Sequence, residues 1–387
     1  MQNLAPTATA SSARRTTTGG SVPLCVDLDG TLIRSDMLWE STVRLLRRNP
    51  LWLPALLFWW LRGRACLKAQ IARRVTVDAA MLPYQEDLLD FLRAEARAGR
   101  RLVLATASDE ALALPVARQV GLFAETLASN GRLNLRGANK ARVLVERFGE
   151  RGFDYAGNSS VDLPVWARAR QAVVVNASPR LLRRAQAVAN IGGVFGEAPA
   201  RLGEFWVAMK PTAWPRHLPV LAALFIGPSG ALAANLGRAG LAFGGLCLCF
   251  SAMTVLCSLV RLDSDRVNPE RRDLPFASGY LPLSWGLSGA PLLLLAAAAV
   301  CLALPLAYAA VLVAFVAVAV CSIRWDGRFV VTDMLIMASF DFLRVLAGHA
   351  ATGRPAPWWW LAIWAAVSLG LAMLALRLRA AHDPQAR

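Results

Sequence analysis

The second half of this 387-residue chain is nearly free of charged side chains, and this feature most limits how the chain can fold. Between residues 217 and 376, charges occur in a few short clusters separated by runs of about 20 apolar residues, the length that crosses a bilayer's hydrocarbon core. Residues 1 to 212 carry charges throughout. The sequence therefore predicts a water-facing half followed by a membrane-spanning half.

The net charge of +16 comes almost wholly from arginine. No basic stripe is interleaved with aromatic residues, and much of the charge flanks the apolar runs, so we expect no nucleic-acid partner. The seven cysteines include no CxxC pair, and we interpret them as small apolar fillers. Residues 1–20 lack the apolar core of a signal peptide. We expect a disordered tail there, followed by a domain that stays in the cytoplasm.

Three apolar runs in the first half end in polar residues and read as strands: PLCVDLDG, RLVLATAS (101–108) and QAVVVNAS (171–178). Helical patterns lie between them. This alternation predicts a parallel α/β sheet with its ligand at the carboxyl ends of the strands. Asp27, Thr106 and the loop near Asn158 would meet at that edge.

Asp27 and Asp29 follow the first predicted strand. A carboxylate there can attack a phosphoryl group, and a second acid two residues on can protonate the leaving oxygen and later activate water. The other needs are a hydroxyl and a cation for the phosphate oxygens, and Mg²⁺ held by further oxygen ligands. A turn with a helix cap is the alternative interpretation of DLDG.

The order DxDGT, ATAS, Lys140 and GNSSVD resembles the haloacid dehalogenase superfamily of phosphatases, over residues 20 to 200. The resemblance implies a Rossmann-like domain with Asp27 as nucleophile, Asp29 as acid/base and Thr106 as the phosphate-binding hydroxyl. It further implies that Lys140 is the cation that neutralises the phosphate's charge. The implied Mg²⁺ ligands are Asp27, Asp29, Asn158 and Asp162. Lys140 could instead be a surface lysine.

One position departs from that family's pattern. Asn158 stands where an aspartate is usual, and an amide oxygen ligates Mg²⁺ without adding charge. Asp154 or Asp162 could compensate, although Asp154 also fits a structural role.

About 70 residues separate the first two motifs, more than a loop needs, and predict a helical cap over residues 34–95. Its segment NPLWLPALLFWWLRGRACLK holds a 12-residue apolar run, too short to span a bilayer. The run is either a buried cap helix or an interfacial element pressing on lipid, with Arg62, Arg64 and Lys68 meeting headgroups.

Six spans are expected in the second half. Arginines and lysines gather before the first, after the second, after the fourth and after the sixth, and only Arg238 and Arg354 fall in the other loops. This bias places both termini in the cytoplasm of a multi-pass protein of the bacterial inner membrane. The expected spans are 217–236, 241–260, 283–303, 305–323, 330–349 and 357–376.

The loop RLDSDRVNPERRDLPFASG (261–279), with AMKPTAWPRHLPV and DMLIMASFDFLRVLAG, resembles the UbiA family of intramembrane prenyltransferases. The likeness is greatest to the bacterial branch that includes polyprenyl-phosphate phosphoribosyltransferases. It implies that basic and acidic residues bind a diphosphate through Mg²⁺. The matching residues are Lys210, Pro211, Trp214, Asp265, Arg266, Pro269, Arg271, Pro275, Ala277, Ser278, Gly279, Asp333, Arg344, Ala347 and Gly348.

The first acidic motif of that family is altered here. Cys257, Ser258 and Arg261 occupy its earlier polar and acidic positions, which leaves Asp265 in register and Asp263 as a possible substitute metal ligand. An arginine at a ligand position repels a metal ion, which disfavours ordinary Mg²⁺-diphosphate chemistry. The family usually has about nine spans, and we expect a transferase that is shortened or no longer active.

Asp341 and Arg344 lie on one helical face of the fifth span. They form either an internal ion pair that fixes packing or the wall of a polar substrate pocket.

These observations predict a phosphatase-like domain (21–204) fused to a UbiA-like membrane domain (205–387). The leading hypothesis is a transferase of prenyl or phosphoribosyl groups that acts on lipid-linked phosphates, with polyprenyl phosphate and membrane lipid as partners and Mg²⁺ as cofactor. A membrane-anchored phosphatase with a degraded bundle, or a non-enzymatic scaffold, is the alternative.

Overall fold

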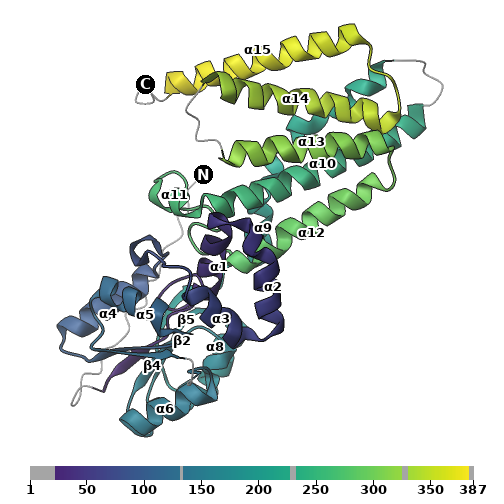
Figure 1. The fold of residues 1–387 in the computed structure, drawn as a ribbon. Coiled ribbons are helices and arrows are strands. Elements are labelled where there is room, and N and C mark those ends of the chain that lie inside the picture. The colour runs from purple at the N-terminus through teal and green to yellow at the C-terminus, as the bar shows by residue number, and fades with distance from the viewer. Residues whose placement is uncertain (1–21, 131–133, 227–231, 325–329, 383–387) are drawn as a thin grey trace, which may run out of the picture. The chain divides into compact units, whose positions relative to one another are not determined.

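A computed structural model describes residues 22–130, 134–226, 232–324 and 330–382. The chain forms two compact units, Met1–Pro199 and Ala200–Arg387, each with its own hydrophobic core (Figure 1). The division falls at residue 199, where the sequence suggested 204. The expected disordered tail lies outside the described residues.

Six parallel strands form the sheet of the N-terminal unit, in the order β3-β2-β1-β4-β5-β6. The predicted parallel α/β sheet is therefore confirmed. The order reverses between β1 and β4, the place where sheets of this kind bind ligands. The strands are β1 (Leu24–Val26), β2 (Leu102–Asp109), β3 (Glu125–Ser129), β4 (Asp154–Gly157), β5 (Ala172–Ala177) and β6 (Ile191–Glu197).

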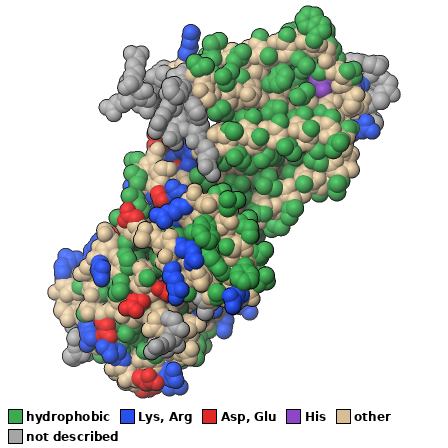
Figure 2. Space-filling view, viewed as in Figure 1, with side chains coloured by type: hydrophobic (Ala, Val, Ile, Leu, Met, Phe, Trp, Pro, Cys, Tyr) green, Lys and Arg blue, Asp and Glu red, His purple; other side chains and the backbone are tan. Residues whose placement is uncertain are grey.

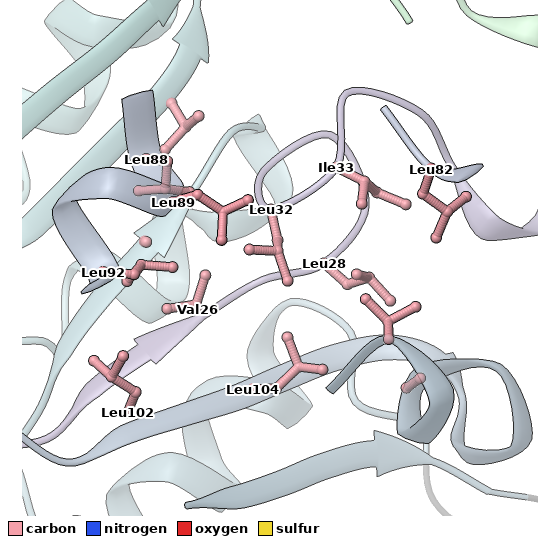
Figure 3. Close-up of a cluster of buried hydrophobic side chains, with 14 of the residues drawn as sticks. Val26, Leu28, Leu32, Ile33, Leu82, Leu88, Leu89, Leu92, Leu102 and Leu104 are labelled. Carbon is pink, nitrogen blue, oxygen red and sulfur yellow. The ribbon is translucent and has the colours of Figure 1, made fainter. Parts of the chain in front are cut away.

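Helices cover both faces of this sheet because alternate strand residues point to opposite sides. On one face of the sheet, Val26 and Leu104 pack against Leu88 of the first helical layer. On the other face, Cys25 packs in a cluster with Trp166 of the second layer. Figure 3 shows the first cluster, with α4 leucines directed at β1 and β2. The helices are α4 (Glu86–Arg97) and α5 (Glu110–Val120) in the first layer, and α6 (Ala138–Phe148), α7 (Leu163–Trp166) and α8 (Pro179–Gln186) in the second.

A helical cap is inserted between β1 and α4. It has a separate small core that includes Leu45, Trp59 and Ile71. The cap is shorter than the expected 34–95, because α4 presents its leucines to the sheet and so belongs to the main fold. Its elements are α1 (Met37–Arg48), the 3₁₀ turn η1 (Pro50–Trp52), α2 (Leu53–Leu61), α3 (Arg64–Ala72) and η2 (Ala79–Met81).

The C-terminal unit is helical, and four of its helices are long and apolar enough to cross a membrane: Asn235–Val260, Leu283–Cys301, Leu306–Ile323 and Val331–Thr352. This count covers the described residues only. The elements are α9 (Arg201–Ala208), the 3₁₀ helix η4 (Pro211–Phe225), α10 (Leu232–Val260), α11 (Leu262–Val267), α12 (Leu283–Cys301), α13 (Leu306–Arg324), α14 (Val330–Thr352) and α15 (Trp358–His382).

The expected first span, 217–236, is wrong as drawn. Pro215 and Pro219 interrupt α-helical hydrogen bonding, and the chain forms η4 before α10 begins at Leu232. Arg238, expected in a loop, lies inside α10. The expected sixth span, 357–376, corresponds to α15, whose described apolar stretch is Trp358–Leu374.

The 3₁₀ helix η4 nevertheless runs the length of the bundle. Fifteen residues at about 2.0 Å each extend roughly 30 Å, which matches the hydrocarbon core. Gly348 of α14 permits close contact, since a Cβ there would lie 1.9 Å from the Val220 carbonyl oxygen. At the far end, Arg354 donates hydrogen bonds to carbonyl oxygens of η4 and its cap, the shortest being 2.7 Å to Ile226.

Candidate active site

The turn after β1 carries the two predicted carboxylates and is shaped by Gly30. Gly30 has φ of +73°, and a Cβ there would lie 2.0 Å from Nδ2 of Asn158, so only glycine fits. The side chain of Asn176, at the end of β5, donates a hydrogen bond of 3.1 Å to the Gly30 carbonyl oxygen. The turn is thereby fixed beside the ends of β4 and β5.

Lys140 is directed into this turn from the first turn of α6. Its side chain is 4% exposed, and Nζ donates to Oδ1 of Asp27 at 2.8 Å and to the hydroxyl of Tyr155 at 2.7 Å. The Tyr155 hydroxyl donates onward to Oδ1 of Asp162 at 3.1 Å. The surface-lysine alternative is therefore excluded, and a buried chain of hydrogen bonds joins Asp27 to Asp162.

Asp29 is held by two other donors. The backbone N–H of Met37, at the start of the cap, donates to Oδ1 at 2.8 Å, and the hydroxyl of Ser108 donates to Oδ2 at 2.6 Å. Thr106 is fully buried in β2, and its Oγ1 accepts the backbone N–H of Ser108 at 3.0 Å. The ATAS segment therefore contacts Asp29 through the Ser108 hydroxyl, and Thr106 acts on Asp29 only by its hydrogen bond to Ser108.

Both aspartates have raised pKa values. Burial raises the pKa of Asp27 from its usual 3.8 to about 6, against the opposing effect of Lys140. Burial also raises the pKa of Asp29 to about 6, and the hydrogen bond from Ser108 opposes it. Two carboxyl groups that titrate near pH 6 can supply one carboxylate and one carboxylic acid near neutral pH.

The oxygen ligands around the turn suit a weakly bound Mg²⁺. Asp162 is occupied by its own loop, because its Oδ2 accepts from the backbone N–H groups of Asn158 and Ser159 and from the Ser159 hydroxyl. Among the described residues no cluster of three His, Cys, Asp or Glu side chains could hold a metal. The Asp27 carboxylate and the Asn158 amide remain, and they fit an ion that keeps several waters and shares the substrate's phosphate.

A cavity of about 730 Å³ lies over these groups. The cap contributes Lys68, whose Nζ donates to the Ala107 carbonyl oxygen at 3.1 Å and whose charge opposes the raised pKa of Asp29. A phosphate entering this space would meet several cations. The charged and amide side chains around it include Asp27, Asp29, Lys68, Arg136, Lys140 and Asn158.

Asp154 lies outside this site. It is buried at the start of β4, the strand end opposite to the cavity, and pairs with Arg100 and Arg170. Its role is structural.

In the C-terminal unit, three of the predicted residues gather at one end of the bundle. Burial raises the pKa of Asp265, and the nearby charges of Arg271, Arg261 and Lys210 oppose this shift. The Arg271 guanidinium lies 3.5 Å from Oδ1 of Asp265. This group, Lys210, Arg261, Asp265 and Arg271, is called the cationic cluster below. Three cations face one carboxylate in it.

Arg266 and Asp263 flank the cationic cluster on α11. Nε of Arg266 donates to the Ala277 carbonyl oxygen at 3.1 Å and so fastens α11 to the following loop. Asp263 is half-buried in the same short helix.

Arg344 and Asp333 occupy different levels of α14. Asp333 lies in its first turn, and eleven residues later, roughly 16 Å along the helix, Arg344 pairs with Asp341. Nε of Arg344 also donates to Nδ1 of His217, in η4, at 3.3 Å. Arg344 therefore takes part in an ion pair within α14, one of the two expected alternatives, and its hydrogen bond to His217 ties α14 to η4.

Residues 24–167 match the model of the haloacid dehalogenase-like hydrolase family. The N-terminal unit is a haloacid dehalogenase-like domain. The matched region runs from β1 to α7 and includes Asp27, Thr106, Lys140 and Asn158.

Two curated proteins resemble a larger part of the chain. The uncharacterized protein y4nM of Sinorhizobium fredii is 29% identical over 344 residues, which are 87% of this chain and 66% of that protein. The decaprenyl-phosphate phosphoribosyltransferase of Mycolicibacterium smegmatis is 28% identical over 173 residues, 43% of this chain and 53% of that protein. The chain thus spans less than two thirds of each relative's length.

Solved structures resemble the haloacid dehalogenase-like domain at low identity. A protein with unknown function from Bordetella pertussis Tohama I is 19% identical, with a TM-score of 0.34, and covers 45% of this chain and 97% of its own. A substrate-bound phosphoserine phosphatase is 12% identical, with a TM-score of 0.32, covering 46% of this chain and 94% of its own. The assignment of the domain rests on the family match and on the sheet, not on these values.

Sequence reasoning overlooked three side chains of the site in the haloacid dehalogenase-like domain. Ser108 was detectable, because it lies two residues beyond Thr106 and so shares its face of the strand. Tyr155 and Lys68 carried no comparable signal. Each reaches the cavity region through tertiary packing, one from β4 and the other from the cap.

Proposed function

We propose that the haloacid dehalogenase-like domain is a Mg²⁺-dependent phosphomonoester hydrolase, held at the membrane by the helices that follow and acting on a lipid-linked phosphate. The observation that carries this proposal is the buried contact between Lys140 and Asp27, beside an Asp29 that is oriented by Ser108 and Met37.

Asp27 is the proposed nucleophile. Lys140 occupies Oδ1, whereas Oδ2 makes no hydrogen bond within the described part of the chain, and Asp27 lines the cavity. Attack by Oδ2 on phosphorus would form an acyl-phosphate and expel the alcohol. Lys140 would neutralise charge on the carboxylate and on the transferred phosphoryl group.

Asp29 is the proposed acid and base. Its raised pKa favours the protonated form that gives a proton to the leaving alkoxide. The resulting carboxylate would then take a proton from the water that hydrolyses the acyl-phosphate. The Ser108 hydroxyl would keep the carboxyl group oriented through both steps.

Asp27 and Asn158 would hold the metal together with the substrate. Bound Mg²⁺ would screen the phosphate's negative charge from the attacking carboxylate. Because Asn158 adds no charge, the ion should bind weakly in the absence of phosphate.

The proposed substrate class is a phosphate carried on a lipid. Support comes from the four helices of membrane-spanning length and from the name of the mycobacterial relative, which acts on decaprenyl phosphate.

We place the domain on the cytoplasmic side of a bacterial inner membrane. Lys210, at the start of η4, lies near Asp265 in α11, so the connection to the domain and the arginine-rich loop share one end of the bundle. Positive charge favours the cytoplasmic side.

Substitution of Asp27 by Asn in the full chain tests the activity. Release of inorganic phosphate should fall at least about 10³-fold, since the amide is not a nucleophile. A covalent phosphoryl-enzyme, trapped with radiolabelled substrate, should be lost as well. Asp90→Asn, on the exposed side of α4, is the matched control and should retain both. Unchanged turnover in Asp27→Asn would refute the assignment.

A second candidate function belongs to the C-terminal unit, and the cationic cluster favours it. The cluster and the 28% identity to a phosphoribosyltransferase support transfer of a prenyl or phosphoribosyl group on a lipid-linked phosphate, in the manner of the UbiA family. The residues there do not fit the family's Mg²⁺, because Arg271 neutralises Asp265 and Arg261 adds charge that repels a metal. An anion would have to be held by the cations themselves. A bundle that serves only as an anchor or scaffold would bind no such anion.

A further inference from the structure

The cap helix α2 exposes an apolar face that no described element of the N-terminal unit covers. Its sequence, LPALLFWWL, contains no polar side chain, yet only Leu56 and Trp59 are buried in the cap core. Leu51 and Leu61 are 81% and 71% exposed at the two ends of this segment. Figure 2 shows hydrophobic side chains over the region of α2. The exposed large residues of the segment are Leu51, Leu53, Leu57, Phe58, Trp60 and Leu61.

A contiguous surface of this kind marks an interaction site in a protein that must remain soluble on its water-facing side. The buried face is already satisfied by Leu45, Leu67 and Ile71, so α2 does not need its exposed side chains for the fold of the cap. These side chains are available to a partner.

The charge around α2 indicates which partner. Residues 41–77 contain eight arginines and lysines and no aspartate or glutamate. Of these, Arg44 is buried and pairs with Glu40, and Lys68 lies at the cavity, so the other cations supply the charge near α2. The Arg62 guanidinium lies 5.5 Å from the Phe58 ring centroid, and that of Arg74 lies 4.8 Å from the ring of Trp59. Apolar side chains flanked by arginines and tryptophans fit the boundary between acyl chains and anionic headgroups.

A bilayer is the partner that this chain would meet, since four of its helices have membrane-spanning length. A domain tethered to a bilayer meets that bilayer at high effective concentration, so a weak surface can still dock. A twelve-residue apolar segment, Pro50–Leu61, is too short to span and long enough to lie in the interface.

We propose that α2 docks the haloacid dehalogenase-like domain on the surface of an anionic phospholipid bilayer. Trp60 lies both on this surface and on the wall of the cavity that contains Asp27. Docking thus brings the cavity to the headgroup layer, where a lipid-borne phosphate enters it. This last consequence rests on the proposed phosphatase function, whereas the docking does not.

Photo-cross-linking in the full chain tests the docking without relying on activity. A benzoyl-phenylalanine replaces Leu57, and the protein is reconstituted in vesicles of phosphatidylglycerol and phosphatidylcholine. A matched label at Arg142, exposed on α6, is the control. Lipid adducts are expected at position 57 and not at 142. Adducts of position 57 to residues 200–387 or to a second copy of the chain, or no lipid adduct, would overturn the proposal.

Kinetics test the consequence for the substrate. Leu57→Glu places a charge on the apolar face, and it should lower hydrolysis of a polyprenyl phosphate in vesicles about tenfold while hydrolysis of soluble p-nitrophenyl phosphate stays unchanged. Val188→Glu, exposed on the same domain, should change neither rate. Equal losses on both substrates would refute a docking role. Lipid adducts with no hydrolysis of either substrate by the unmutated chain would leave the docking standing and refute the phosphatase.

Discussion

Replacement of Lys140 by methionine should abolish turnover while the domain still folds. Nζ of Lys140 lies 2.8 Å from Oδ1 of Asp27 and is only 4% exposed. At an effective dielectric constant of about 20, two unit charges at this separation attract by roughly 6 kcal/mol. One unit of pKa corresponds to about 1.4 kcal/mol, so this attraction is large enough to move the pKa of Asp27 well above 7 when it is lost.

The cost to stability is smaller than that attraction suggests. With a pKa of about 6, the Asp27 carboxylate at pH 7 lies only about 1.4 kcal/mol from its protonated form. The variant can take up a proton and avoid a buried, unpaired charge. The free energy of unfolding should therefore fall by about 1 to 2 kcal/mol, and not by the 3 to 5 kcal/mol typical of a broken buried pair.

Activity should respond much more strongly, since a protonated carboxyl is a poor nucleophile. We expect phosphate release at pH 7 to fall about 10³-fold, with the acidic limb of the kcat profile moved to higher pH. The assay is steady-state phosphate release by the full chain in detergent between pH 5 and 9, beside calorimetric unfolding.

A control on the same helix separates the site from general effects. Arg142 pairs with Glu146 at the surface, and both side chains are 65% exposed. Arg142→Met should change neither rate nor stability measurably. If Lys140→Met keeps the wild-type acidic limb and its rate stays within threefold of wild type, the pair does not control the nucleophile and the reasoning fails.

Three further substitutions probe other contacts. The pKa of Asp29 is raised from 3.8 to about 6, so its carboxyl stabilises the fold below about pH 4 and this contribution is lost as pH rises through 6. Asp29→Asn should therefore be inactive yet more stable than wild type at pH 8, by up to about 3 kcal/mol in calorimetry, with no advantage at pH 4; equal stability at pH 8 would contradict the raised pKa. Asn158→Asp should lower the Mg²⁺ concentration for half-maximal activity about tenfold, whereas Asn134→Asp, elsewhere on the cavity wall, should not. Gly348→Ala should destabilise the C-terminal unit by about 1 to 3 kcal/mol because its Cβ meets backbone 1.9 Å away, whereas Gly240→Ala meets nothing; similar melting of both variants in detergent would exclude the close contact.

Local patterns were sufficient to predict the sheet and the position of the first carboxylates. Short buried strands that end in polar residues can occupy few places other than the middle of a parallel sheet, and Asp27 and Asp29 follow such a strand directly. The order of the motifs then indicated Lys140. The local sequence does not determine which hydrogen-bond partners these side chains have in the folded domain.

Asp162 shows this limit most clearly. Its spacing after Asn158 suits a metal ligand, but the same spacing lets the carboxylate cap its own loop, and the backbone N–H groups of Asn158 and Ser159 engage it. Metal binding and loop capping by Asp162 require the same sequence spacing and differ only in where the carboxylate lies in three dimensions.

In the second half, four of the expected spans correspond to the four membrane-length helices, and the error lies in the first span. Hydropathy detects apolar length but not the type of helix, so η4 and the start of α10 looked like one α-helical span. The prolines were visible in the sequence. Their consequence is a 3₁₀ helix, which rises about 2.0 Å per residue and packs closely on Gly348 of α14 through Val220.

The two candidate phosphate sites differ in charge, and this difference predicts opposite responses to a chelator. In the haloacid dehalogenase-like domain, Lys68 and Arg136 line the cavity, but Lys140, the cation beside the nucleophile, is already paired with Asp27, so the proposed Mg²⁺ supplies the positive charge at the point of attack. In the cationic cluster, Lys210, Arg261 and Arg271 outnumber Asp265, so an anion can bind without metal. EDTA should therefore stop phosphate release by the full chain but leave a site for inorganic diphosphate, measured by equilibrium binding. Arg261→Asp should make that binding weaker in EDTA and restore it with Mg²⁺, because a second carboxylate then lies beside Asp265. Diphosphate binding that needs Mg²⁺ in the unmutated chain, or that Arg261→Asp leaves unaltered, would mean that the cluster does not hold the anion.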